Sequence, residues 1–200
     1  MTSPIWHEPT LTRSERWGLH NLCGMTIWLT GLSGSGKSTI AHEAARQLHQ
    51  AGVLTYVLDA DNIRHGLNSD LGFSNSDRAE NIRRIAEVSH LCSDAGLVTF
   101  VPIISPFVTS RDHARKIHLE DDLIFIEVFV ATPLAECERR DPKGMYAQAR
   151  SGKLTGFTGI DAPYEAPQQP DVVLGAHDEK LEESVKTLID AIAARRDLKH

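Results

Sequence analysis

The stretch MTIWLTGLSGSGKST, residues 25–39, decides the fold of this chain. It opens with a short apolar run that is typical of a buried strand, and it continues as a glycine-rich turn that fits G-x-x-x-x-G-K-[ST]. Residues 36–52 then carry apolar side chains at helical spacing and end at a glycine. A strand, this turn and a helix in that order are the context in which the pattern marks a phosphate-binding loop, or P-loop.

The residue types of this loop suit the phosphate groups of a nucleotide. Glycines let backbone N–H groups curl around phosphates at the N-terminus of the following helix. Lys37 adds a positive charge for the terminal phosphates, and the Ser38 hydroxyl can ligate Mg²⁺. The predicted ATP-binding loop consists of Gly31, Leu32, Ser33, Gly34, Ser35, Gly36, Lys37, Ser38 and Thr39.

Apolar runs alternate with helical patterns along the rest of the chain. This alternation predicts an α/β protein with the P-loop nucleoside-triphosphate hydrolase/kinase fold, in which a parallel sheet is flanked by helices on both faces. The predicted strands are 25–31, 54–61, 97–105, 123–131 and 171–175, and the predicted helices are 36–52, 76–96, 109–118, 133–139 and one that begins near 181.

The chain has 200 residues, a length that favours a single domain over 1–200. Residues 141–170 are rich in glycine and proline, and so long a loop inside a compact domain is typical of an active-site lid. Residues 1–24 precede the first strand as an N-terminal arm. Within it, Trp6 and Trp17 either anchor the arm or contact a second copy of the chain.

Composition excludes several classes of function. A net charge of -6 argues against a nucleic-acid surface, which normally carries a basic field. Cys23, Cys92 and Cys137 are odd in number and far apart, which makes a disulfide framework or a zinc site improbable and favours the reducing cytoplasm. The N-terminus lacks the layout of a signal peptide, and no apolar run approaches the ~20 residues of a membrane helix.

Two acidic residues close the second predicted strand, where ligands gather in open α/β sheets. If the strand extends to Asp61, then Asp59 and Asp61 point in the same direction. One carboxylate would join the Mg²⁺ shell and the other would take a proton from an attacking hydroxyl, and we assign these roles to Asp59 and Asp61 respectively. The structural alternative is a turn carboxylate that caps Asn62.

A P-loop alone does not separate kinases, GTPases, motors and nucleotide-binding modules. The sequence has no base-reading N-K-x-D motif, which argues against a GTPase. The small size, the acidic residues after the second strand and the predicted lid favour a small-molecule kinase.

The acceptor is indicated by four further runs: LDADNIRHGLNSDLGFSNSDRAENIRR (58–84), ISPF (104–107), RDPKGMY (140–146) and GFTGIDAPYEAP (156–167). In this order, and over nearly the whole chain, they resemble the adenylylsulfate kinase family. The resemblance implies that ATP phosphorylates the 3′-hydroxyl of adenosine 5′-phosphosulfate in sulfate assimilation, giving 3′-phosphoadenosine 5′-phosphosulfate and ADP. It also implies Mg²⁺, a homodimer and a possible association with ATP sulfurylase.

The same resemblance assigns roles to individual residues. The flat ring of Phe73, on a polar loop, suits an adenine, and Phe157 would cover the other side of the base when the lid closes. The alternative is that Phe73 plugs its own loop. The implied catalytic residues are Lys37, Asp61, Ser105 and Lys143, and the implied acceptor-binding residues are Asp61, Arg64, Phe73, Arg78, Asn81, Ile104, Ser105 and Phe157.

Direct in-line transfer needs positioning and charge neutralisation, so we expect Ser105 to position the substrate without being phosphorylated. The chain departs from the family pattern at Ala60, Val108 and Thr155, and the last two departures remove positive charge near an anionic substrate. A kinase of a related nucleotide or polyol, and a regulatory nucleotide-binding module, therefore stay open as alternatives.

Overall fold

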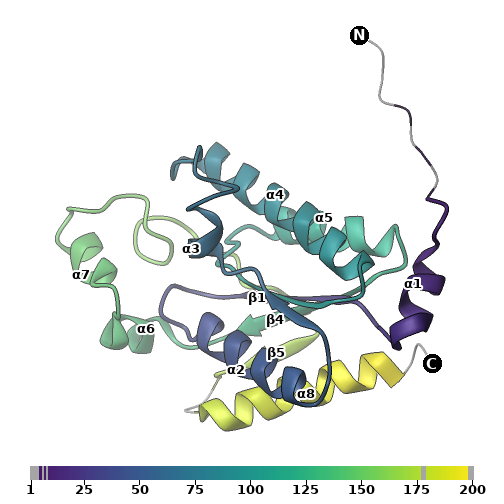
Figure 1. Cartoon of the computed structure of the whole chain (residues 1–200). Helices are drawn as coiled ribbons and strands as arrows, with labels where there is room; N and C mark the ends of the chain where they lie inside the picture. Colours follow the sequence, from purple (N-terminus) through teal and green to yellow (C-terminus); the bar gives the residue numbers. More distant parts are fainter. Residues whose placement is uncertain (1–4, 6, 8, 177–178, 198–200) are drawn as a thin grey trace.

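Five parallel strands form one sheet in the order β2-β3-β1-β4-β5 in the computed structural model, which describes residues 5, 7, 9–176 and 179–197 (Figure 1). The central strand β1 pairs with β3 on one side and β4 on the other, so that Ile27 lies opposite Phe100 and Ile126. The bounds are β1 Met25–Thr30, β2 Thr55–Val57, β3 Val98–Pro102, β4 Ile124–Val130 and β5 Val172–Leu174. The predicted fold class is confirmed.

Two pairs of helices cover the two faces of the sheet (Figure 1). Helices α2 (Lys37–Gln50) and α8 (Leu181–Asp197) pack against one face, and α4 (Asn75–Asp94) and α5 (Val108–Leu119) pack against the other. The short helices are α1 Arg13–His20, α3 Ala60–Ile63, α6 Leu134–Arg140 and α7 Met145–Arg150.

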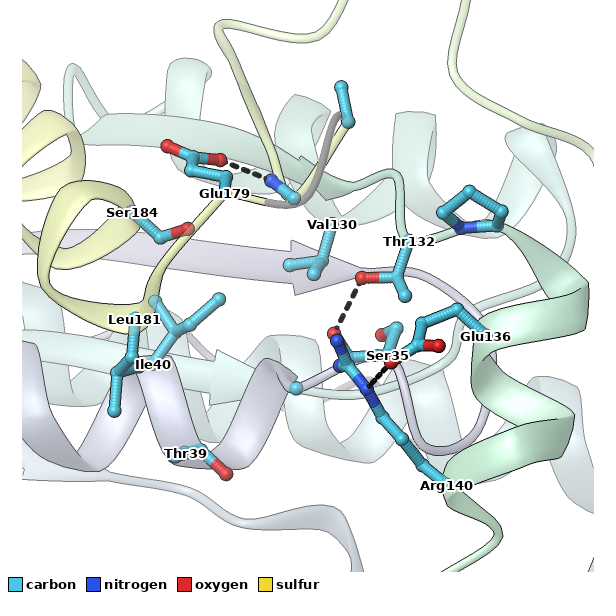
Figure 2. A pocket seen from close by; sticks show the side chains of 14 residues that line it. Ser35, Thr39, Ile40, Val130, Thr132, Glu136, Arg140, Glu179, Leu181 and Ser184 are labelled. Atoms are coloured by element: carbon cyan, nitrogen blue, oxygen red, sulfur yellow. Dashed lines mark hydrogen bonds and ion pairs between the residues drawn. The ribbon is translucent and has the colours of Figure 1, made fainter.

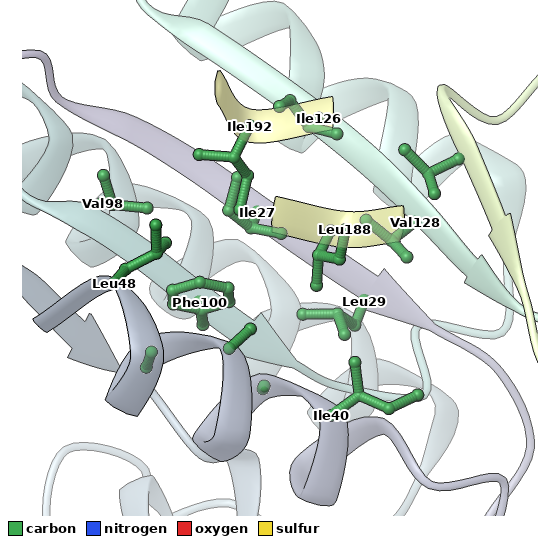
Figure 3. Packing of buried hydrophobic residues seen from close by; sticks show 14 of the residues in the cluster. Ile27, Leu29, Ile40, Leu48, Val98, Phe100, Ile126, Val128, Leu188 and Ile192 are labelled. Atoms are coloured by element: carbon green, nitrogen blue, oxygen red, sulfur yellow. The ribbon is translucent and has the colours of Figure 1, made fainter. Parts of the chain in front are cut away.

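Each face of the sheet has its own apolar core, because successive side chains of β1 point to opposite faces. Ile27 and Leu29 point toward α2 and α8, where they meet Leu188 and Ile192 (Figure 3). Trp28 points the other way, into a second core with Ile85 of α4. This double burial explains why β1 is a continuous apolar run and not an alternating one.

Two local predictions from the sequence are wrong, and a third is confirmed. Strand β2 ends at Val57 and does not reach Asp61, because Asp59 starts helix α3 as its N-cap and accepts a hydrogen bond from the Asp61 N–H at 3.0 Å. The 141–170 segment is not irregular throughout, since it contains α7. The helix predicted over 109–118 is present as α5, and it buries the polar side chains of Arg111 and His118.

The N-terminal arm contains helix α1, which is held against the C-terminal end of α4. Trp17 Nε1 donates to the carbonyl oxygen of Asp94 at 2.9 Å, and Arg13 Nε donates to the Asp94 carboxylate at 2.7 Å. Trp17 therefore anchors the arm, whereas Trp6 lies outside the described residues. No helix in the described part of the chain combines the length and the apolar character that a membrane crossing requires.

The start of β1 offers a test of this packing. A Cβ built on Gly24 would lie 1.9 Å from the carbonyl oxygen of Ser93, so Gly24→Ala forces β1 and the end of α4 apart. We expect a loss of about 1–3 kcal/mol of unfolding free energy. Gly18→Ala on α1 is the control, because its Cβ meets nothing within 4 Å. Equal melting temperatures for the two variants would contradict this account of the contact.

Candidate active site

The P-loop between β1 and α2 encloses the amino group of its own lysine. Lys37 Nζ donates to the carbonyl oxygens of Gly31 at 3.0 Å and Leu32 at 2.7 Å. Burial lowers the pKa of Lys37 to about 8. Gly31 has φ +149°, and a Cβ there would lie 2.6 Å from the Val130 carbonyl oxygen, so glycine is required. The loop has the predicted position between strand and helix.

A cavity of about 600 Å³ lies beside the P-loop (Figure 2). Thr132 Oγ1 donates to the Ser35 carbonyl oxygen at 2.9 Å, and Arg140 Nε donates to Glu136 at 2.7 Å across its wall. The volume is within the range of small-molecule sites. The lining comes from the P-loop, α2, the end of β4, α6 and the residues before and within α8: Ser35, Gly36, Thr39, Ile40, Val130, Thr132, Pro133, Glu136, Arg140, Gly175, Ala176, Glu179, Leu181 and Ser184.

Sequence reasoning missed most of this cavity. Thr132, Glu136 and Arg140 follow β4, and Glu179 lies more than thirty-five residues further along the chain. The sequence carried one usable signal, which is that the carboxyl ends of parallel strands gather ligands. It gave no sign of which polar residues after β4 and β5 would meet.

The acidic residues after β2 lie in and beside α3. Because Asp59 caps that helix, its carboxylate already accepts the Asp61 N–H, and the shared direction expected for a continuous strand does not arise. The Asp61 carboxylate forms an ion pair with the ammonium group of Lys143 from the 141–170 segment. Both side chains of this pair are more than half exposed. The structure thus joins two predicted catalytic residues that are far apart in the sequence.

Phe73 is 70% exposed on the loop before α4, which excludes the alternative in which it plugs that loop. The guanidinium carbon of Arg64 lies 4.5 Å from the centroid of its ring. Arg64 also donates to the carbonyl oxygen of Gly72 at 3.1 Å. A cation therefore lies over the aromatic ring, as in a cation–π contact.

Arg78 and Asn81, on α4, differ in their surroundings. Arg78 bridges from the helix to the 141–170 segment, donating to the Gly156 carbonyl oxygen at 2.7 Å and to Thr158 Oγ1 at 3.2 Å. Asn81 is buried, and its Oδ1 accepts from Asn68 Nδ2 at 3.0 Å. Arg78 contacts polar groups that an anion could replace, whereas Asn81 is part of the packed interior.

Ile104 and Ser105 follow β3 at the same edge of the sheet. Ser105 has φ +40°, a left-handed conformation that is uncommon for serine, and its side chain is 1% exposed. Its Oγ accepts a hydrogen bond from Trp28 Nε1 at 3.1 Å. The Ile104 carbonyl oxygen accepts from Thr30 Oγ1 at 2.6 Å. The hydroxyl of Ser105 is thus enclosed within the protein.

The 141–170 segment packs in a small apolar cluster that also contains Cys137 of α6 and Leu32 of the P-loop. Phe157 is 6% exposed and meets the ring of Tyr146 edge-on, with centroids 4.9 Å apart. Tyr146 donates its hydroxyl to the Ser33 carbonyl oxygen of the P-loop at 2.9 Å. Phe157 therefore does not face Phe73 in this structure, and stacking on the far side of a base would require the segment to rearrange.

A second hollow of about 490 Å³ lies between the P-loop and the far half of the 141–170 segment. Leu32 forms one wall. The opposite wall consists of Gly159, Ile160, Asp161, Ala162, Pro163 and Tyr164. The P-loop thus contributes to two hollows, the first through Ser35 and Gly36 and the second through Leu32.

Relatives of known function share most of this chain. The model of the family described as adenylylsulphate kinase matches residues 23–175. An adenylyl-sulfate kinase of Clostridium acetobutylicum is 45% identical over 197 residues, which cover 98% of this chain and 97% of that protein. An adenylyl-sulfate kinase of Staphylococcus carnosus is 50% identical over 184 residues, which cover 92% of each.

Solved structures agree with these relatives. The APS kinase of Mycobacterium tuberculosis in complex with AMPPNP and APS has a TM-score of 0.83 and 52% identity, covering 86% of this chain and 99% of that chain. A gluconokinase of Sinorhizobium meliloti, with a TM-score of 0.52 and 17% identity, shares the fold alone. The chain therefore belongs to the adenylylsulfate kinase family.

Proposed function

We propose that this chain transfers the γ-phosphoryl group of ATP to the 3′-hydroxyl of adenosine 5′-phosphosulfate, the activity for which its family is named. The observation that carries the proposal is the position of Lys37. A Cβ built on Gly34 of the P-loop would lie 3.6 Å from Pro142 Cδ, so Lys143, which follows Pro142 and pairs with Asp61, comes close to the loop that holds Lys37. A P-loop lysine and an ion pair from two other segments thus lie close to one another, and the same P-loop lines two hollows.

The donor nucleotide binds at the P-loop, with its nucleoside part in the 600 Å³ cavity. Lys37 exchanges the loop carbonyls of Gly31 and Leu32 for phosphate oxygens, which are stronger acceptors for an ammonium group. Asp61 then accepts the proton of the attacking hydroxyl, and Lys143 neutralises charge on the transferred group. These steps need no covalent intermediate, in keeping with a Ser105 hydroxyl that is enclosed by the protein.

Mg²⁺ fits the residues that the structure offers. Ser38 is exposed at the start of α2, and Asp59 follows β2, which is separated from β1 by β3 at the same edge of the sheet. Mg²⁺ usually takes one or two protein oxygens and completes its shell with water and phosphate, so a hydroxyl and one carboxylate suffice. Ser38 and Asp59 would hold the ion. When bound, Mg²⁺ would neutralise part of the negative charge of the phosphate groups.

The acceptor binds between the loop before α4 and the 141–170 segment. Arg64 and Arg78 present guanidinium forks that match tetrahedral oxyanions, and both are bonded to backbone carbonyls that substrate oxyanions would replace. Arg64 covers one face of the Phe73 ring. Adenine would stack on that face after displacing Arg64, or on the opposite face of the ring. Ile104 and Ser105 would form the sheet edge of the proposed site, with Asn81 supporting it from the packed interior. Phe157 would join the site when the 141–170 segment rearranges.

The 141–170 segment acts as a lid in this proposal, and the chain forms a single kinase domain. Closure over both substrates would exclude water and limit hydrolysis of ATP. We further propose a cytoplasmic homodimer with possible association with ATP sulfurylase, on the strength of the family resemblance.

The reaction is tested by a coupled assay with ATP and adenosine 5′-phosphosulfate, run beside AMP and a polyol as acceptors. We expect turnover with the phosphosulfate, and Lys37→Ala should reduce it by about a hundredfold or more because charge on the transferred group is no longer neutralised. Lys116→Ala is the control, since that lysine is exposed on α5 and pairs with Glu120 one turn away. Preference for AMP or a polyol would support another kinase, and absence of turnover would support a nucleotide-binding module.

Phe73→Ala tests the stacking role. Base–aromatic stacking is worth about 1–3 kcal/mol per base, so the KM for the adenylyl acceptor should rise roughly 5- to 150-fold. The KM for ATP and the melting temperature should stay unchanged because the ring is exposed. Phe73→Tyr should restore the acceptor KM. A fall in melting temperature with equal effects on both substrates would show that Phe73 serves packing.

Tyr146→Phe tests the lid's attachment to the P-loop. The variant keeps the ring contact with Phe157 but loses the hydrogen bond to Ser33, which is worth about 0.5–1.5 kcal/mol. Limited proteolysis of the ligand-free variant within residues 151–156 should be roughly twofold to tenfold faster. Tyr56→Phe, altered on the exposed edge strand β2, is the control. Cleavage that is equal in all three proteins, with and without ADP plus phosphosulfate, would contradict the lid.

A further inference from the structure

A buried arginine of α5 joins three parts of the chain beneath the proposed acceptor site. Arg111 is 2% exposed. Its Nε donates to the Glu127 carboxylate of β4, and its Nη1 donates to the Ser105 carbonyl oxygen, each at 2.7 Å. Its Nη2 donates to the Glu165 carbonyl oxygen, also at 2.7 Å. One guanidinium group thus holds the sheet, the loop after β3 and the C-terminal end of the 141–170 segment.

Other hydrogen bonds cross the same place, which we call the Arg111 joint and define as residues 105–108, Arg111 and residues 164–165. The Glu165 N–H donates to the Pro106 carbonyl oxygen at 2.8 Å, and the Glu165 carboxylate accepts the Val108 N–H at 2.8 Å. The hydroxyl of Tyr164 is 2.9 Å from Thr30 Oγ1, at the end of β1. The end of the segment is therefore attached to the sheet edge by backbone as well as side chains.

The loop that Arg111 holds is strained. Ser105 has φ +40°, a backbone conformation that residues other than glycine rarely adopt. Such a conformation persists only where the surroundings determine it. At Ser105 the surroundings are the Trp28 indole on the hydroxyl and Arg111 on the carbonyl oxygen. Removing the second contact would let the loop relax and would move Ile104 and Ser105.

We propose that Arg111 is a positioning residue for the acceptor substrate: it fixes two walls of the acceptor site, the 104–106 loop and the end of the lid, in register with each other. The inference rests on the proposed function, because both walls are assigned to the acceptor there. Arg111 touches no substrate itself. Misplacement of a binding wall by about 1 Å can cost a hundredfold in rate, so a residue below the site can control it.

Arginine is required at this position because its donors are spread over a planar fork. A lysine in its place keeps the positive charge beside Glu127, but its single ammonium cannot reach a carboxylate and two carbonyl oxygens on different segments. Arg111→Lys therefore separates the charge of the residue from its geometry. Glu127 also keeps a second cation, since Arg115 lies 3.4 Å from it.

The experiment compares Arg111→Lys with Arg115→Lys in the full chain. Arg115 is one turn further along α5 and pairs with Glu127 and Asp171, but it has no hydrogen bond to the 104–106 loop or to the lid. For Arg111→Lys we expect the acceptor KM to rise about tenfold or more, while the Kd for AMPPNP changes by less than about twofold. Arg115→Lys should leave both constants within about twofold of the wild type.

The inference would be overturned if Arg111→Lys had the same acceptor KM as the wild type. It would also be overturned if the variant lost affinity for the acceptor and for AMPPNP by the same factor. If Arg111→Lys does not fold, Glu127→Gln decides the matter, because an amide keeps the shape of the Glu127 side chain but removes the charge that holds Arg111 Nε. That variant should raise the acceptor KM by about threefold or more, and an unchanged KM would refute the joint.

Hydrogen exchange separates this inference from the proposed function. The amides of Ser105, Phe107, Val108, Tyr164 and Glu165 should exchange faster in Glu127→Gln than in Arg115→Lys, whatever the substrate is. A wild-type protein without turnover on adenosine 5′-phosphosulfate would refute the proposed function. A wild-type protein with turnover, combined with unchanged exchange and acceptor KM in Glu127→Gln, would refute the role of Arg111 alone.

Discussion

The burial of β1 between β3 and β4 is the constraint on which the rest of the structure depends. Every residue of β1 is buried, and its two faces supply the centres of two separate cores. Because the strands are parallel, all of their carboxyl ends lie at one edge of the sheet. The P-loop leaves from the middle of that edge, so residues that follow β2, β3, β4 and β5 can all approach it.

Positive charges at this edge are held by the protein's own oxygen atoms. Lys37 is bonded to loop carbonyls, Arg78 to the carbonyl oxygen of Gly156, and Lys143 to the Asp61 carboxylate. An acidic chain with a net charge of -6 can attract an anion only through such local groups. Binding of phosphate or phosphosulfate would exchange one set of acceptors for another, and this limits the desolvation cost.

The 141–170 segment is attached differently at its two halves. Near its start, the hydroxyl of Tyr146 contacts the P-loop and Lys143 contacts Asp61, both through single side-chain interactions. At its end, Arg111, Glu165 and backbone groups form several hydrogen bonds to the sheet edge. The Lys143–Asp61 pair is exposed, whereas Tyr146 is buried. An exposed contact opens at a lower free-energy cost than a buried network, so Lys143 should separate from Asp61 more readily than Glu165 separates from the sheet edge.

The sequence by itself determined the sheet, the P-loop and the family, because apolar runs, a spaced glycine pattern and four motifs are local properties of the chain. It did not determine that β2 ends at Val57, where capping of α3 by Asp59 prevails over strand continuation. Tertiary structure alone decided that Phe157 is buried on Tyr146, that Lys143 meets Asp61, and that Arg111 spans three segments. These contacts join residues from distant segments, and their geometry follows from how the helices and loops pack, which no local pattern encodes.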